Sequence, residues 1–82
     1  MATVFLPIEI ARSFCDEKIE HFVTGSNIRD LVKALDEAYP GIGTRLNDGI
    51  AVAIDGEIFQ EWLLENVSPN SQIHFIPAIE GG

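Results

Sequence analysis

A single long amphipathic helix pattern lies near the middle of this chain, between two groups of strand-like segments. Apolar residues recur there at the helical period and form one stripe, which consists of Ile28, Leu31, Val32, Leu35, Ala38 and Tyr39. Asn27 followed by Asp30 is typical of an N-cap and an acidic first turn, and Pro40-Gly41 predicts the helix end. A helix with one apolar stripe must cover it, so we expect the flanking strands to form a sheet against it.

Two strand-like segments precede the helix. Residues 3–10 alternate with the period of a strand, and one face consists of Val4, Leu6, Ile8 and Ile10. Pro7 has no amide donor, so it should occupy an unpaired position or a bulge. Residues 18–24 are rich in β-branched and aromatic side chains and predict a second strand, which forms a hairpin with the first. Phe22 lies on the opposite face from its neighbours, and only a bulge would bury all the large side chains together.

Further strands are expected after the helix. Residues 42–46 are too short for a strand or a long helix and are expected to form a single turn. Residues 50–54 predict a strand, and Asp55-Gly56 suits a two-residue turn that brings residues 57–59 back beside it. Residues 72–79 predict the last strand.

The segment between the last two strands is expected to cover part of the core. Residues 60–66 are compatible with a helical turn, and Trp62, Leu63 and Leu64 should cover an edge of the core. The element order is β-β-α-β-β-β, which predicts an α+β fold with a mixed sheet of four to five strands on one main helix. With the last strand beside the first, this is the β-grasp arrangement. We expect a domain over residues 1–79 and a flexible tail over residues 80–82.

The charge of the chain limits the classes of partner. Thirteen acidic residues against five basic ones give a net charge of −8, which repels nucleic acids and anionic membrane surfaces. No Lys or Arg follows Arg45, so the second half is acidic throughout. This half is either a solvated surface or a surface that docks onto a basic protein.

The single cysteine and the apolar runs bear on location. Cys15 has no partner for an internal disulfide, and the first residues lack the basic start and apolar run of a secretory signal. The apolar runs are far shorter than the ~20 residues that cross a bilayer. These features predict a cytoplasmic protein without a membrane partner.

The usual catalytic motifs are absent from the sequence. We find no phosphate-binding glycine loop, no H-E-x-x-H, no C-x-x-C, no G-x-S-x-G and no dinucleotide fingerprint. His21, His74 and Cys15 lie in separate segments, and a metal or nucleophile site would require all three to converge. We therefore expect no catalytic residue, no metal and no bound cofactor in this chain.

The last residues carry the one feature that points to a function. Gly81 and Gly82 directly follow a predicted strand and form a thin peptide that can enter a narrow channel. Extended residues from Pro77 onward reach about 20 Å, which is enough to deliver a terminal carboxylate into a partner's active site. The alternative is a frayed end without a role.

Several segments together carry a resemblance to a known family. Residues 74–82 (HFIPAIEGG) form a strand, a proline and a diglycine, residues 25–31 enter the helix, residues 35–41 leave it, and residues 52–57 form the central hairpin. In this order they resemble the ubiquitin-like sulfur-carrier proteins of the MoaD/ThiS family. The resemblance covers most of the chain and implies a ubiquitin-like β-grasp fold.

The resemblance also implies a chemistry. In this family an adenylyltransferase similar to the ubiquitin-activating enzymes uses ATP to adenylate the terminal carboxylate, here that of Gly82 after Gly81. A sulfur donor then displaces AMP and leaves a thiocarboxylate, which a sulfur-accepting synthase consumes in cofactor or amino-acid biosynthesis. The chain would be a carrier rather than an enzyme, and Cys15 would not carry the sulfur. The subfamily stays open, since Pro69-Asn70-Ser71 replaces the Gly-Asp turn of many members. The small subunit of molybdopterin synthase and a ubiquitin-like protein modifier remain alternatives.

Alternation along the last strand predicts a docking surface. Ile73 and Phe75 should face the helix, which leaves His74, Ile76 and Ala78 outward. We expect Ile76 to join Phe5, together with Ala51 and Ala53, in an apolar patch. The predicted partner-binding residues are Phe5, Ile76, Pro77, Ile79 and Glu80.

Overall fold

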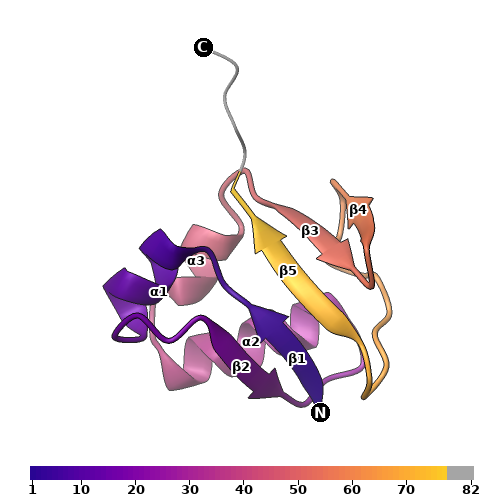
Figure 1. Cartoon of the computed structure of the whole chain (residues 1–82), viewed down its shortest axis with the longest axis horizontal. Helices are drawn as coiled ribbons and strands as arrows, with labels where there is room; N and C mark the ends of the chain where they lie inside the picture. Colours follow the sequence, from indigo (N-terminus) through magenta and orange to yellow (C-terminus); the bar gives the residue numbers. More distant parts are fainter. Residues whose placement is uncertain (78–82) are drawn as a thin grey trace.

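The computed structural model describes residues 1–77, in which five strands form one mixed sheet and α2 crosses behind it (Figure 1). The elements are β1 (Ala2–Phe5), α1 (Ile8–Phe14), β2 (Glu20–Val23), α2 (Ile28–Ala38), α3 (Ile42–Leu46), β3 (Ala51–Ile54), β4 (Glu57–Phe59) and β5 (Gln72–Ile76). None of the helices within residues 1–77 combines the length and the apolar character needed to span a bilayer.

The strand order is β2-β1-β5-β3-β4, so the first and last strands lie side by side in the centre of the sheet. β1 and β5 run parallel, while β1 with β2, β5 with β3, and β3 with β4 are antiparallel pairs. Parallel neighbours need a crossover connection, and α2 lies within it. This is the β-grasp arrangement, and the predicted fold class is confirmed.

The predicted helix is confirmed as α2, with the expected cap. The backbone N–H of Asp30 donates to Asn27 Oδ1 at 2.8 Å, which satisfies one of the free donors at the helix start. The apolar stripe faces the sheet, and its buried members are Ile28, Leu31, Val32 and Leu35. The chain leaves the helix through Gly41, whose φ of 98° lies in the left-handed region that favours glycine.

Loss of this cap should destabilise the protein measurably. We expect Asn27→Ala to lower the free energy of unfolding by about 1 kcal/mol, because the Asp30 N–H loses its acceptor. Chemical denaturation followed by circular dichroism measures the difference. The matched control is Asn70→Ala in an exposed loop, which should change stability by less than about 0.5 kcal/mol. Equal stabilities for the two variants would contradict the capping role.

The strand predicted over residues 3–10 is wrong beyond Phe5, because the next residues form α1. Pro7 takes the N-cap position of this helix with φ −59°, where its missing N–H and its restricted φ cost nothing. Ile10 is buried from the helix, whereas Ile8 is 43% exposed rather than part of the buried face. The first two strands pair antiparallel as expected, but α1 connects them in place of a hairpin turn.

β2 follows simple alternation, and the bulge that would bury all its large side chains is not formed. His21 and Val23 are buried, whereas Phe22 is 61% exposed. His21 Nε2 lies 2.7 Å from the carbonyl oxygen of Lys18, and its ring packs edge-on against Tyr39. The buried imidazole therefore has a polar partner and a defined position.

The two-residue turn after β3 is confirmed. Asp55 and Gly56 both have positive φ values, 50° and 90°, as a type I′ turn requires. The Asp55 carboxylate accepts a hydrogen bond from the Gln72 N–H at 2.9 Å, which ties the turn to the start of β5. The single turn expected over residues 42–46 is also confirmed, as α3.

The helical turn expected over residues 60–66 is not formed, and the segment consists of bends, a turn at Leu63-Leu64 and an isolated bridge from Asn66 to Asn27. Its carbonyl groups face α2 instead, since Leu63 O and Glu65 O accept the N–H groups of Arg29 and Ile28 at 2.8 and 3.0 Å. These bonds satisfy donors at the start of α2 that no residue within that helix can reach. Leu63 and Leu64 are 41% and 69% exposed, so the expectation that they cover the core is wrong.

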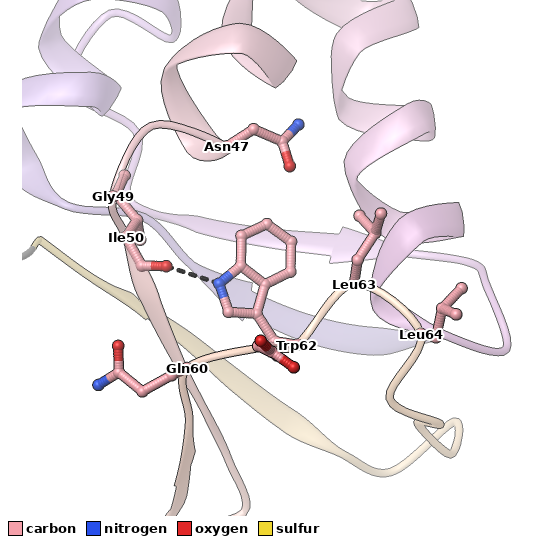
Figure 2. Close-up of a pocket in the computed structure, with 8 residues that line it drawn as sticks. Asn47, Gly49, Ile50, Gln60, Trp62, Leu63 and Leu64 are labelled. Atoms are coloured by element: carbon pink, nitrogen blue, oxygen red, sulfur yellow. Dashed lines mark hydrogen bonds between the residues drawn. The ribbon is translucent and has the colours of Figure 1, made fainter.

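Trp62 does cover the core, as predicted. Its indole is buried and packs edge-on against Phe75, with ring centroids 5.6 Å apart. The indole N–H donates to the carbonyl oxygen of Ile50 at 2.6 Å (Figure 2). Because the indole N–H has this acceptor, the large ring is buried without leaving an unpaired hydrogen-bond donor.

Candidate functional site

β5 holds the chain in a fixed position up to the start of the predicted tail. It lies between β1 and β3, and its carboxyl end is at the opposite end of the sheet from the N-terminus (Figure 1). Ile73 and Phe75 are buried against the core, as predicted, whereas His74 is exposed. β5 ends at Ile76, and Pro77 is exposed directly after it. A segment that follows Pro77 therefore starts from a rigid strand.

Some of the predicted site residues fall beyond Pro77. Ile79, Glu80, Gly81 and Gly82, like the outward Ala78 and the last part of the strand expected over residues 72–79, lie outside the described residues. The predicted division at residue 79 lies there too. The geometry of the site is therefore built from the residues up to Pro77.

The outer face of the sheet brings together the apolar residues that the sequence predicts there. Strand register places Phe5 beside His74, and their rings stack at 4.4 Å between centroids with planes 8° apart. His74 lies beside Ala53, and Ala51 lies beside Ile76. We call this set the outer-face patch, which consists of Phe5, Ala51, Ala53, Ile58, His74 and Ile76.

Two members of the outer-face patch need comment. Ile58 lies beside Ala53 and is 62% exposed, and it is not among the residues predicted for this surface. The Asp55-Gly56 turn could have identified it, because a two-residue turn sets the register of the strands that it joins. His74 was predicted to point outward, but its stacking on a neighbouring strand depends on the pairing of β1 with β5.

A groove lies where β5 ends, and no motif in the sequence indicates it. Its volume is about 720 Å³, and its lining residues are Pro7, Ile8, Glu9, Ile10, Arg45, Asp48, Gly49, Ile50 and Pro77. These residues come from the start of α1, from the α3–β3 connection and from the end of β5. The groove combines apolar side chains with one cation, Arg45, and two carboxylates, Glu9 and Asp48.

A second groove lies beside Trp62, with a volume of about 550 Å³ (Figure 2). Asn47, Gly49 and Ile50 line one side, and residues 60–64 line the other. The Trp62 indole N–H is already bonded to Ile50, so its role here is structural.

The groups considered for nucleophilic or metal chemistry do not converge. Burial raises the pKa of the Cys15 thiol, although the nearby Lys18 ammonium opposes the rise. A buried neutral thiol is a poor nucleophile. Among residues 1–77, no group of three or more His, Cys, Asp or Glu side chains is arranged to hold a metal ion.

Comparisons with known proteins agree with this fold. A chain in the crystal structure of the Amycolatopsis orientalis BexX/CysO complex has a TM-score of 0.85 at 22% identity, with all of both chains covered. CysO of Mycobacterium tuberculosis, described as an antigen, also has a TM-score of 0.85, at 18% identity over 96% of this chain and 100% of that one.

A third structure extends the likeness to archaea. The small archaeal modifier protein 1 of Methanosarcina acetivorans has a TM-score of 0.79 at 19% identity, over 99% of this chain and 95% of that one. No curated protein matches the chain in sequence. The high TM-scores establish the fold, which is the ubiquitin-like β-grasp. At sequence identities this low they establish nothing beyond the fold.

Family membership comes from the sequence itself. The model of the ThiS family matches residues 7–82, which is nearly the whole chain and includes Gly81 and Gly82. The resemblance in the helix entry, the central hairpin and the ending is thereby confirmed. The chain belongs to the ThiS family of ubiquitin-like sulfur-carrier proteins.

Proposed function

We propose that this protein is a sulfur carrier whose Gly82 carboxylate is adenylated and then converted to a thiocarboxylate. The observation that carries the proposal is the ThiS family match, which extends through Gly81 and Gly82. In the first step the carboxylate attacks the α-phosphate of ATP and releases pyrophosphate. In the second step a sulfur nucleophile attacks the acyl carbon and releases AMP.

The properties of the described residues support a carrier without catalytic groups of its own. A carboxylate is a poor electrophile, whereas an acyl-adenylate accepts sulfur, and the activating enzyme would supply the groups for both steps. Cys15, the one thiol in the sequence, is buried and its pKa is raised, which makes it unsuited to accept sulfur. Gly81 and Gly82 have no side chains to obstruct a narrow active-site channel.

Two partners follow from this proposal: an adenylyltransferase similar to the ubiquitin-activating enzymes, and a synthase that accepts the sulfur. We assign their docking to the outer-face patch together with Pro77, Ile79 and Glu80. CysO, which has the same fold, is known in a complex with BexX. Both steps would take place in the cytoplasm, the location that the sequence predicts.

The proposed reaction can be tested by intact-mass spectrometry. The 82-residue chain is incubated with its activating enzyme, ATP and a sulfide source. The expected product has the mass change of one oxygen replaced by sulfur, and omission of ATP should prevent the change. An unchanged mass with an enzyme that consumes ATP in the presence of this chain would overturn the proposal.

A ubiquitin-like modifier is the second candidate, because the small archaeal modifier protein 1 has the same fold. A modifier would appear linked through Gly82 to lysines of other proteins. Because no Lys or Arg follows Arg45, trypsin would leave residues 46–82 attached to each modified lysine, and mass spectrometry would detect that branch. The small subunit of molybdopterin synthase would instead form a stable complex with the large subunit of that enzyme. The thiocarboxylate is common to the carrier and to this subunit, so complex formation separates them.

The outer-face patch makes its own prediction. We expect Ile76→Asp to weaken binding to the activating enzyme about tenfold or more, because a charge would be buried at an apolar contact. Isothermal titration calorimetry measures the affinity, and thermal unfolding checks the fold. The matched control is Leu64→Asp, at a residue that is 69% exposed and outside the patch. Equal affinities for both variants would reject the patch as the docking surface.

A further inference from the structure

The outer edge of β2 presents backbone groups that have no partner in the sheet. The Leu6 N–H donates to the Ile19 carbonyl oxygen at 3.0 Å, which makes these two residues a hydrogen-bonded pair of the antiparallel ladder. Hydrogen-bonded and non-bonded pairs alternate, so His21 and Val23 turn their N–H and C=O groups toward β1. Phe22 turns its N–H and C=O groups outward. Within residues 1–77 no backbone bond satisfies them.

A groove runs beside this edge, between β2 and α2. Its volume is about 370 Å³, and its lining residues are Lys18, His21, Phe22, Val23, Thr24, Ala34, Leu35, Ala38 and Tyr39. Leu35 and Val23 are buried at its base, and the Tyr39 ring is held against His21 at 5.6 Å. A strand added to the edge of β2 would place every second side chain over this mostly apolar groove.

The other side chains of such a strand would meet the outer face of the sheet. Glu20 and Phe22 point to that face, and Phe22 is 61% exposed. A basic residue opposite Glu20 and an aromatic residue opposite Phe22 are the favourable cross-strand pairs. The net charge of −8 also attracts a basic segment and opposes the approach of a second copy of this chain.

We propose that the edge of β2 binds an extended segment of a partner protein, in which apolar residues over the groove alternate with basic and aromatic residues over the outer face. The free N–H and C=O of Phe22 supply main-chain hydrogen bonds, the groove accepts the apolar side chains, and Glu20 selects a cation. This site lies on a different edge of the molecule from Pro77 and does not depend on the sulfur-carrier function.

The probe is a capped peptide, Val-Lys-Val-Phe-Val-Lys-Val, titrated into the ¹⁵N-labelled protein. In antiparallel register its Phe meets Phe22, one Lys meets Glu20, and the alternate Val residues cover the groove. We expect chemical-shift changes confined to β2 and the facing side of α2, and an at least tenfold slower hydrogen exchange of the Phe22 amide at saturation. Unchanged exchange of that amide in the presence of saturating peptide would overturn the proposal.

Two proline variants distinguish pairing at the β2 edge from the effect of a proline at any sheet edge. Phe22→Pro removes the outward N–H but no bond of the β1–β2 ladder, and it should abolish peptide binding. The matched control is Ile58→Pro on the opposite edge. Ile58 is 62% exposed, and its pair with Ala53 is the non-bonded pair next to the Asp55-Gly56 turn, so its N–H also points outward. Equal binding by both variants would overturn the proposal.

A charge reversal keeps the test decisive if Phe22→Pro does not fold. Glu20→Lys should weaken binding of the lysine peptide severalfold and should strengthen binding of the same peptide with Glu in place of Lys. If Glu20→Lys does not change which of the two peptides binds more tightly, the assignment of Glu20 is overturned. Sedimentation equilibrium supplies the last check, because a dimer that Glu20→Lys alters would mean that a second copy, and not a basic segment, occupies the edge.

Discussion

Deletion of Gly81 and Gly82 is expected to abolish thiocarboxylate formation completely. Under the proposed function the shortened chain still ends in a carboxylate, but that carboxylate belongs to Glu80 and is withdrawn by about 7 Å. It would also carry a charged side chain, which would obstruct the narrow channel that Gly81 and Gly82 are proposed to enter. The fold should not change, because the sheet of the described residues is complete at Ile76.

Intact-mass spectrometry after incubation with the activating enzyme, ATP and sulfide measures this effect. The control is Cys15→Ala, which removes the thiol and should leave the gain of one sulfur at Gly82 intact. Adding one alanine after Gly82 should have the same effect as the deletion, because it displaces the carboxylate and adds a side chain. A sulfur that is gained by the deletion variant, or lost in Cys15→Ala, would contradict the assignment of Gly82.

Replacement of Ile73 should have the largest effect on stability. Ile73 is fully buried in the middle of the sheet, where β5 pairs with Val4 of β1 and Ile54 of β3. Ile73→Ala removes three carbon atoms from the core and leaves a cavity, so we expect the free energy of unfolding to fall by about 2–5 kcal/mol. For a domain of this size that is a large part of the total stability.

Urea denaturation of Ile73→Ala and the wild type, followed by tryptophan fluorescence, gives the difference. Trp62 is a suitable probe because it is buried against Phe75, and Phe75 lies on β5 together with Ile73. The control is Gln72→Ala, at an exposed neighbour on β5, which should change the stability by less than about 0.5 kcal/mol. A change below about 1 kcal/mol in Ile73→Ala would mean that the core closes around the missing atoms.

The elements predicted correctly are those specified by neighbouring residues. The α2 helix has its cap at Asn27 and its apolar stripe within eleven residues, and a turn at Asp55-Gly56 joins β3 to β4. In both cases the interactions that stabilise the element are local. The β-grasp fold class could also be predicted, because one amphipathic helix between pairs of strands has few ways to cover its stripe.

The two wrong elements are segments whose pattern fits more than one structure. The alternation of residues 3–10 favours a strand. Ile10, Ala11 and Phe14 also lie on one face of a helix, however, and Pro7 favours a helix start. Residues 60–66 have a helical composition. Their carbonyl groups bond the N–H groups of Arg29 and Ile28 instead, and such a long-range interaction leaves no periodic signal in the sequence.

Local patterns were sufficient to predict the family, the main helix and the outward direction of Phe5 and Ile76, because alternation and capping act between near neighbours. Which of these outward residues meet depends on strand pairing across the sheet. The stack of Phe5 on His74, the place of Ile58, the groove at Pro77 and the free edge of β2 all depend on the order β2-β1-β5-β3-β4. That order is set by the burial of strands far apart in the chain against one helix, which no local pattern encodes.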